Sequence, residues 1–408
     1  ATSALAVTSP FIFRMNIARA PSLAVILLLL ALWALFERRS RVLFALTLIF
    51  VWCYNAWPLL FVALFAVILG ELLVAAGSSG LRAVAAARSR WATSFGIMLA
   101  AAVVGLVINP YFPENIAFSW LHIFGIGLRN YQDTIGVGAE WYPYAAADLV
   151  RDAPLPFLAL LGSVTLFVYA IRSSGEHGAP KERFAQIFAA VILAGGFFAL
   201  TLKSRRNVEF LMPAMMLLAA LLSSLALRRE ALREAWASLR RSPPIAAATI
   251  SFAVLLAALS VQSVANAARD LRGSYPWSRY ERAANFLRTS LPEGATVVSS
   301  DWDDFPPLFY WNDRSTYVIG LDPTYMYLFD RDLYRVWVDL TRGRVSGDLV
   351  SVIRDRFHAS AVTIDGDHGA MRNLFDADHR FERWYEDDEA AIYGIGKPPI
   401  TLSYIARL

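Results

Sequence analysis

The feature of this sequence that most constrains its fold is a series of apolar stretches, each close to the length of a membrane span. A helix crosses the hydrocarbon core of a bilayer with about 17–25 mostly apolar residues. One stretch ends near Phe13, and the others cover Pro21–Phe36, Val42–Tyr54, Pro58–Ala76, Ala92–Ile108, Pro154–Ile171, Phe184–Leu202, Phe210–Leu227 and Ile245–Val264. The series predicts a polytopic α-helical membrane protein.

Composition and short motifs argue against several other classes. The chain is 57% hydrophobic and 18% charged, whereas a soluble domain is roughly half apolar and a quarter charged. Its basic residues lie in short clusters between the apolar stretches, not on one face with interleaved aromatic side chains, so nucleic acid is not an expected partner. Cys53 is the only cysteine and the histidines are scattered, so neither a disulfide framework nor a zinc site is expected.

The basic clusters predict how the helices are oriented. Lys and Arg favour cytoplasmic connections, and the clusters occupy alternate connections: Arg38, Arg39 and Arg41; Arg82, Arg88 and Arg90; Arg172, Lys181 and Arg183; and Arg228, Arg229, Arg233, Arg240 and Arg241. We expect these clusters to face the cytoplasm, and we expect the long connection 109–153 and the tail to face outward. The expected domains are a transmembrane helical domain, 1–267, and an extracytoplasmic domain, 268–408.

The long outward connection carries the first candidate site. At its centre the carboxylate of Glu140 stands between Gly138 and Trp141, and long connections often carry function. Glu140 could bind a divalent cation, position an acceptor amide or hydroxyl, or act as a base. The alternative is a solvated loop residue.

Arginines on the outward side form the second candidate site. Arg14 and Arg19 flank one helix edge, and Arg205 and Arg206 begin another helix. Cations on the translocated side oppose the usual topology, and guanidinium groups bind phosphate in a bidentate way. Together they predict a site for a phosphate or diphosphate. The alternatives are contact with lipid headgroups or local pairing, for instance of Arg206 with Glu209.

The tail predicts a small α/β domain with a mainly parallel sheet. Strands are expected at residues 295–300, 315–320 and 361–364, with helices over Trp277–Leu291, Tyr325–Leu340 and Asp348–His358 between or before them. Ligands of such sheets bind at the carboxyl ends of the strands.

The first expected strand of the tail runs into an acidic segment that contains Asp301, Trp302, Asp303 and Asp304. Its oxygens could hold Mg²⁺, Mn²⁺ or Ca²⁺. The alternative is that Asp303 or Asp304 caps the following helix, and the same alternative applies to Asp322.

Four stretches resemble the GT-C superfamily of membrane glycosyltransferases, and within it the catalytic subunit of oligosaccharyltransferase. Residues 281–307 resemble the helix, turn and strand that lead into the WWDYG motif, with Trp302 and Asp303 on its Trp-Asp, and residues 312–316 resemble the N-R-T-T that follows. VGAEWYP, 137–143, resembles the external-loop motif, with Glu140 on its glutamate. RRNVEFLMP, 205–213, is similar to the helix start that contacts the lipid phosphate, and 9–57 resembles the stretch that holds the D-x-E metal motif.

The chain also departs from that family. It has DWDDF in place of WWDYG, so recognition of an Asn-X-Ser/Thr acceptor does not carry over, and Arg14, Asn16 and Arg19 stand where the D-x-E acids are expected. A metal-independent member, with its base in the first external loop, is an equally good model. The chain begins inside an apolar stretch, so we expect upstream helices, and the catalytic base, to lie outside it.

The resemblance implies a GT-C glycosyltransferase that moves a sugar from a polyprenyl-phosphate or diphosphate donor to a glycan, lipid or protein acceptor. Arg14, Arg19, Arg205 and Arg206 would hold the donor phosphate, and Glu140 would orient the acceptor or a metal such as Mg²⁺ or Mn²⁺. Trp141, Asp301, Trp302, Asp303 and Asp304 would shape the acceptor side. The alternative is a non-catalytic membrane factor that binds lipid-linked glycans.

Overall fold

The structure is a computed structural model that describes residues 8–17, 19–78, 80–173, 181–226, 237, 240–273, 275–345 and 347–399. The chain forms two compact units, one of residues 1–130 and 139–273 and one of residues 131–138 and 274–408. We call them the helical unit and the C-terminal unit. The helical unit extends slightly beyond the expected boundary at residue 267 because its last helix continues to Arg272.

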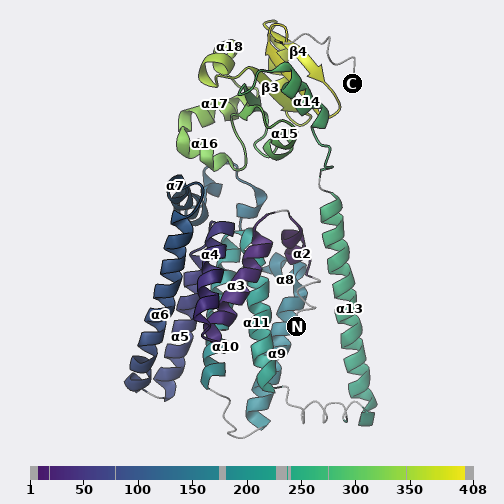
Figure 1. The fold of residues 1–408 in the computed structure, drawn as a ribbon. Coiled ribbons are helices and arrows are strands. Elements are labelled where there is room, and N and C mark those ends of the chain that lie inside the picture. The colour runs from purple at the N-terminus through teal and green to yellow at the C-terminus, as the bar shows by residue number, and fades with distance from the viewer. Residues whose placement is uncertain are drawn as a thin grey trace. The chain divides into compact units, whose positions relative to one another are not determined.

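The helical unit is a bundle of long apolar helices (Figure 1). Its main helices are α2 (Ser9–Asn16), α3 (Pro21–Phe36), α4 (Ser40–Cys53), α5 (Leu59–Ser78), α6 (Gly80–Val107), α9 (Pro154–Ser173), α10 (Lys181–Lys203), α11 (Val208–Ala226) and α13 (Pro243–Arg272). Among the described residues, six helices are long and apolar enough to cross a membrane: α5, α6, α9, α10, α11 and α13. Six stretches of the predicted series are therefore confirmed by length and composition, whereas α3 and α4, of 16 and 14 residues, are shorter.

The helices differ greatly in how much of their surface the bundle covers. In the apolar window of α11, 72% of the residues are buried, against 6% in that of α13. Helix α5 packs closely against α10 at Gly70, where an added Cβ would lie 2.4 Å from the carbonyl oxygen of Ala185. Small residues permit such close helix contacts within a membrane. Helix α11 is thus central to the bundle, and α13 is peripheral.

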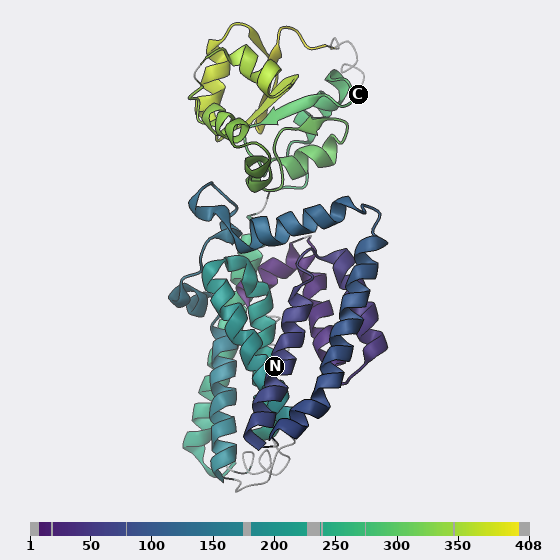
Figure 2. The same cartoon turned by 90° about the vertical axis from the view of Figure 1, so that its left-hand side faces the viewer.

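The connection after α6 is more ordered than a loop. It contains α7 (Glu114–Trp120), the π-helix η1 (Leu121–Leu128), the 3₁₀ turns η2 (Tyr131–Asp133) and η3 (Ala139–Trp141), and α8 (Ala146–Asp152). Helix α7 and η1 run crosswise at the end of α6 (Figure 2). Tyr131 and Ile135 are buried in the core of the C-terminal unit, so part of the connection belongs to that unit.

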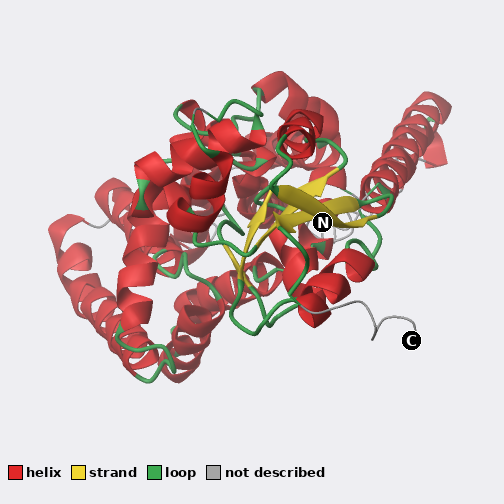
Figure 3. Ribbon diagram, turned by 90° about the horizontal axis from the view of Figure 1, so that it is seen from above, coloured by secondary structure: helices red, strands yellow, loops and turns green. Residues whose placement is uncertain are grey.

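The C-terminal unit is built on a five-stranded sheet of order β2-β1-β3-β5-β4 (Figure 3). Its strands are β1 (Thr296–Ser299), β2 (Thr316–Tyr317), β3 (Ala361–Asp365), β4 (Phe381–Glu386) and β5 (Ala390–Ile395). The first three are parallel, as predicted, with Val297 opposite both Tyr317 and Ala361. Strands β4 and β5, which were not predicted, add antiparallel pairs, so the sheet is mixed.

Short helices cover this sheet: α14 (Glu281–Ser290), α15 (Phe305–Trp311), α16 (Pro323–Phe329), α17 (Arg331–Thr341), α18 (Leu349–Ser351), the π-helix η5 (Val352–Arg356) and α19 (Gly369–Ala377). The helix expected over Tyr325–Leu340 is divided at Asp330, whose carboxylate caps α17 by accepting from the amides of Asp332 and Leu333 at 2.9 Å. Asp322 caps α16 through the amide of Thr324 at 2.8 Å, which confirms the capping alternative for that residue.

Candidate functional site

Arg14 lies at the centre of a charged cluster in the helical unit. It stands in the last turn of α2 and is 9% exposed. Its Nη1 donates to Oε2 of Glu140, and its Nε and Nη2 donate to Oε2 of Glu209 at 3.1 and 3.0 Å. The carboxylate of Glu209 is fully buried. One guanidinium therefore joins carboxylates that are far apart in the sequence, by charge-assisted bonds of the stronger kind.

Glu140 is held on two sides by positive charge. Arg19 Nη1 lies 3.3 Å from Oε2 of Glu140. The backbone oxygen of Glu140 accepts a hydrogen bond from Ser204 Oγ at 2.9 Å. Burial alone would raise the pKa of Glu140, but the charges of Arg206 and Arg14 outweigh it, so the pKa lies below its ordinary value. Glu140 is thus an ionised, positioned carboxylate and not the solvated loop residue of the alternative interpretation.

Arg205 and Arg206 belong to the 3₁₀ turn η4 (Arg205–Asn207), which fixes them against the segment around Glu140. The backbone amide of Arg205 donates to the Tyr142 carbonyl at 3.0 Å, and its Nε donates to the Pro143 carbonyl at 3.1 Å. The guanidinium of Arg206 lies 4.2 Å from the ring centre of Trp141, which is a cation–π contact. The alternative to phosphate binding was a local ion pair between Arg206 and Glu209. Glu209 instead forms its ion pair with Arg14.

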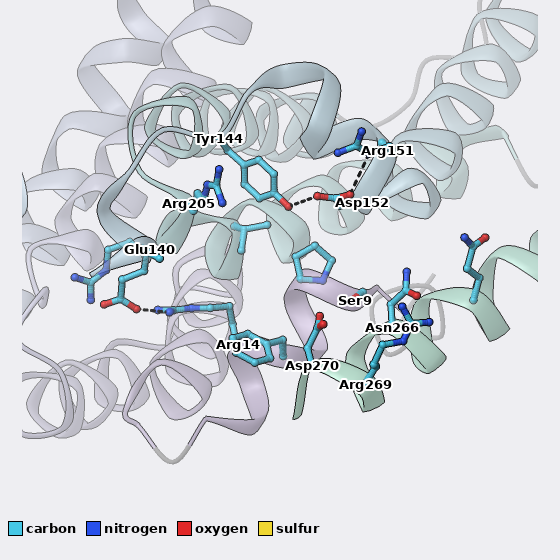
Figure 4. A pocket seen from close by; sticks show the side chains of 16 residues that line it. Ser9, Arg14, Glu140, Tyr144, Arg151, Asp152, Arg205, Asn266, Arg269 and Asp270 are labelled. Carbon is cyan, nitrogen blue, oxygen red and sulfur yellow. Dashed lines mark hydrogen bonds and ion pairs between the residues drawn. The ribbon is translucent and has the colours of Figure 1, made fainter. Parts of the chain in front are cut away.

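These side chains border a cavity of about 650 Å³, which we call the arginine pocket (Figure 4). Its charged lining consists of Arg14, Arg151, Arg205, Arg206 and Arg269 with Glu140, Asp152 and Asp270. Five cations face three carboxylates, so the lining carries an excess of two positive charges. Arg19 does not line the cavity but adds its charge at Glu140. The structure therefore brings together Glu140 and all the arginines predicted for donor phosphate.

The wall of the pocket formed by α13 was not predicted. Gln262, Asn266, Arg269 and Asp270 line it from one face of that helix. The side chains of Gln262, Asn266 and Asp270 make no hydrogen bond or ion pair to any other residue that the structure describes. The sequence does contain a signal for this wall, because Gln262, Asn266 and Arg269 follow one another at spacings of four and three within an apolar span. Polar residues in a membrane span are energetically costly and are usually functional.

A second group missed from the sequence lies on and before α8. Tyr144 Oη donates to Oδ2 of Asp152 at 2.8 Å, and Arg151 Nε lies 3.5 Å from the other oxygen of that carboxylate (Figure 4). Burial and the negative charge of Asp152 raise the pKa of Tyr144. The Tyr144 ring also faces the guanidinium of Arg205 at 5.2 Å. Tyr144 therefore remains a neutral donor beside the pocket.

The acidic segment of the C-terminal unit is organised by local contacts. Oδ1 of Asp301 accepts from the amide of Trp302 at 2.6 Å, and Asp303 is exposed. Asp304 is buried and accepts from Tyr280 Oη at 2.7 Å and from Arg279 Nη2 at 3.2 Å. Asp304 precedes α15, but its side chain makes no capping hydrogen bond. Burial raises the pKa of Asp304 to about 7.

The described residues do not fit a divalent metal site. No group of three or more His, Cys, Asp or Glu side chains within them is arranged to hold a metal ion. Near Glu140 the neighbouring charges are guanidinium groups, which repel a cation. We therefore derive no step through Mg²⁺ or Mn²⁺ at this pocket.

No protein-family model matches this chain, and no curated protein matches it either.

Proposed function

We propose that this chain is a GT-C type membrane glycosyltransferase. It takes a sugar from a polyprenyl-phosphate or diphosphate carrier and transfers it to an acceptor on the extracytoplasmic face of a bacterial inner membrane. The chain resembles that superfamily at Glu140, at the Arg205 helix start and at the Trp302-Asp303 pair. The resemblance and the pocket geometry are independent of each other, and both point to a lipid-linked phosphate.

The observation that carries the proposal is the excess of positive charge in the arginine pocket. Arg14, Arg205 and Arg206 face one cavity beside Glu140, although they lie far apart in the sequence. The cavity is at the ends of membrane-length helices, since α10 ends at Lys203 immediately before η4. The phosphate of a polyprenyl carrier lies at that level in a membrane, and arginine is the side chain best suited to bind it.

The wall of the pocket formed by α13 suits the sugar. Gln262 and Asn266 present amide donors and acceptors that no other described residue uses, and Asp270 presents an unpaired carboxylate. Such side chains can form hydrogen bonds with the hydroxyl groups of a sugar, because each hydroxyl both donates and accepts a hydrogen bond. In this arrangement the arginines hold the phosphate and α13 faces the sugar.

The ionised state of Glu140 defines its part in the reaction. A carboxylate whose pKa is lowered by two arginines is a weak base at neutral pH, so proton abstraction is not its role. It positions Arg14 and Arg19, and it orients an acceptor group that donates a hydrogen bond. Arg14, Arg205 and Arg206 stabilise the negative charge that develops on the leaving phosphate.

A second function, a non-catalytic factor that binds lipid-linked glycans, is favoured by one observation. Both carboxylates of the central cluster, Glu140 and Glu209, are engaged by arginine, and neither is available as a base. Asp270 separates the two functions, because it lines the pocket and has no partner among the described residues. Loss of transfer with intact donor binding in Asp270→Asn would favour the enzyme, whereas a wild-type chain that binds donor but never consumes it would favour the binding factor.

The test of donor binding uses the full chain in nanodiscs. Undecaprenyl diphosphate and undecaprenol, which share a tail and differ in the diphosphate, are the two probes. We expect the wild type to prefer the diphosphate, and Arg205→Ala with Arg206→Ala to weaken its binding by about tenfold or more. Arg172→Ala is the matched control, since Arg172 is exposed at the other end of α9 and does not line the arginine pocket. Equal affinity of wild type and double variant would overturn the phosphate role.

A further inference from the structure

We propose a second phosphate site, at the other end of the helical unit, which binds the phosphodiester headgroup of an anionic phospholipid. The site is a cavity of about 220 Å³ that we call the second pocket. It is independent of the proposed glycosyl transfer, and none of its residues lines the arginine pocket.

The second pocket gathers basic residues from three separate segments of the chain. Arg38 follows α3, Arg90 lies within α6, and Lys181 is the first residue of α10. Helix α10 runs from Lys181 to Lys203, beside the arginine pocket, and its 23 residues span about 34 Å. That length is comparable to the hydrocarbon core of a bilayer, about 30 Å thick. The two pockets therefore lie at opposite ends of a membrane-length helix.

The charge of the second pocket matches a phosphodiester. Arg38, Arg90 and Lys181 line it together with Glu71 and Glu182, which leaves an excess of one positive charge. Glu71 is already satisfied, since Arg90 Nη2 and Trp91 Nε1 donate to its Oε2 at 3.2 and 2.7 Å. The side chain of Arg38, in contrast, makes no hydrogen bond or ion pair to another described residue. A phospholipid phosphodiester carries one negative charge, which this lining can neutralise.

The apolar part of the lining favours a lipid over a soluble anion. Phe36, Val67 and Val74 line the cavity beside the charged groups, and they belong to apolar helices. Acyl chains can continue along such surfaces, whereas free phosphate makes no use of them. Trp91 has the amphipathic ring that is enriched at membrane interfaces. Basic pockets between membrane helices on the cytoplasmic side commonly bind anionic headgroups.

The experiment measures lipids retained by the purified full chain in native mass spectrometry. Phosphatidylglycerol and phosphatidylcholine with identical acyl chains are the probes, because they differ in net headgroup charge. We expect the wild type to retain phosphatidylglycerol preferentially, and Arg38→Asn combined with Lys181→Gln to reduce that preference about tenfold. Asparagine suits position 38, whose φ of 57° is in the left-handed region. Glu182→Gln should strengthen the preference because it removes a negative charge from the lining.

The control is Arg172→Gln, a basic exposed residue of the same end that does not line the pocket. An unchanged preference in this control, together with the opposite effects of the pocket variants, supports the proposal. No preference in the wild type, or an equal loss in the control, overturns it. Displacement of phosphatidylglycerol by millimolar inorganic phosphate would assign the site to a soluble anion and overturn the lipid assignment. None of these results depends on binding of the polyprenyl donor, so failure here leaves the proposed function standing.

Discussion

Charged side chains gather in both units, but they are assembled in different ways. The arginine pocket takes its residues from segments as distant as Arg14 and Asp270, and the charges only partly cancel around a cavity. The acidic segment 301–304 is continuous. The Asp301 carboxylate accepts from neighbouring backbone amides, and the Asp304 carboxylate accepts from the Tyr280 and Arg279 side chains. Converging charges that do not cancel favour an anionic ligand, whereas a cluster of adjacent acidic residues can be satisfied within the fold. We therefore propose the pocket, and not the acidic segment, as the site of donor binding.

The strongest test of this comparison is Arg14→Met. Removal of this guanidinium leaves Glu209, which is 0% exposed, as a buried carboxylate without its partner. Breaking a buried ion pair from one side costs about 3–5 kcal/mol. We expect a correspondingly large fall in the thermal unfolding midpoint of the full chain in detergent, and loss of undecaprenyl diphosphate binding.

Arg14→Met combined with Glu209→Gln separates stability from binding. The double variant removes the unpaired charge, so much of the lost stability should return, whereas donor binding should not. A single variant as stable as the wild type would contradict the central position of Arg14 in the cluster.

Glu140→Gln should have the next largest effect, on transfer and not on binding. The substitution removes a negative charge from a lining that already has a positive excess, so donor affinity should stay equal or increase. Transfer should fall about 100-fold or more, as when one electrostatic contact to a transition state is lost. The measurement is consumption of a polyprenyl-diphosphate-linked sugar by membranes that contain the protein.

Glu114→Gln is the control for Glu140→Gln. Glu114 is exposed in the first turn of α7, in the same connection, and does not line the pocket, so its variant should transfer normally. Full activity of Glu140→Gln would reduce Glu140 to a structural partner of Arg14.

The sequence predicts the helices of this protein better than it predicts the pocket. Apolar length alone identifies α5, α6, α9, α10, α11 and α13, because hydrophobic content is a local property of the chain. The arginines were singled out because positive charge is unexpected on the side predicted to face outward, and Glu140 because it stands in a long connection. Their common cavity depends on the packing of α2 against α11 and α13, which no local pattern encodes. The sequence suggested Arg206 as a partner of Glu209. The ion pair that Glu209 forms with Arg14 likewise follows only from the packing of the helices.

In the C-terminal unit, too, the local sequence predicts only some of the strands. Strands β1, β2 and β3 are rich in β-branched residues and were predicted, whereas β4, which reads FERWYE, is mostly charged and aromatic. Its three aromatic residues favour a strand, but three charged residues interrupt the apolar pattern, and pairing with β5 fixes its place in the sheet. The acidic segment was correctly expected to follow a strand, but the burial of Asp304 against Tyr280 could not be inferred from adjacent residues.

The smallest predicted effect concerns the pH dependence of the acidic segment. Burial raises the pKa of Asp304 from its ordinary 3.8 to about 7, so the fold favours the protonated carboxyl. The stability gained from this group is complete below about pH 4 and is lost as the pH rises through 7. Asp304→Asn keeps the shape and cannot ionise. The difference in unfolding midpoint between variant and wild type should therefore change by a few degrees between pH 5 and pH 8, in favour of the variant at pH 8.

Asp339→Asn provides the control for Asp304→Asn, because Asp339 is exposed and lies 3.8 Å from Arg344 in a weak surface pair. The difference in unfolding midpoint between Asp339→Asn and wild type should stay constant between pH 5 and pH 8. A constant difference for Asp304→Asn would mean that the carboxyl is already ionised at pH 5. In that case the Arg279 contact, at 3.2 Å, would dominate over burial. The acidic segment would then be an ion-paired cluster like the one around Arg14, and the contrast between the two units would reduce to the presence of a cavity in one of them.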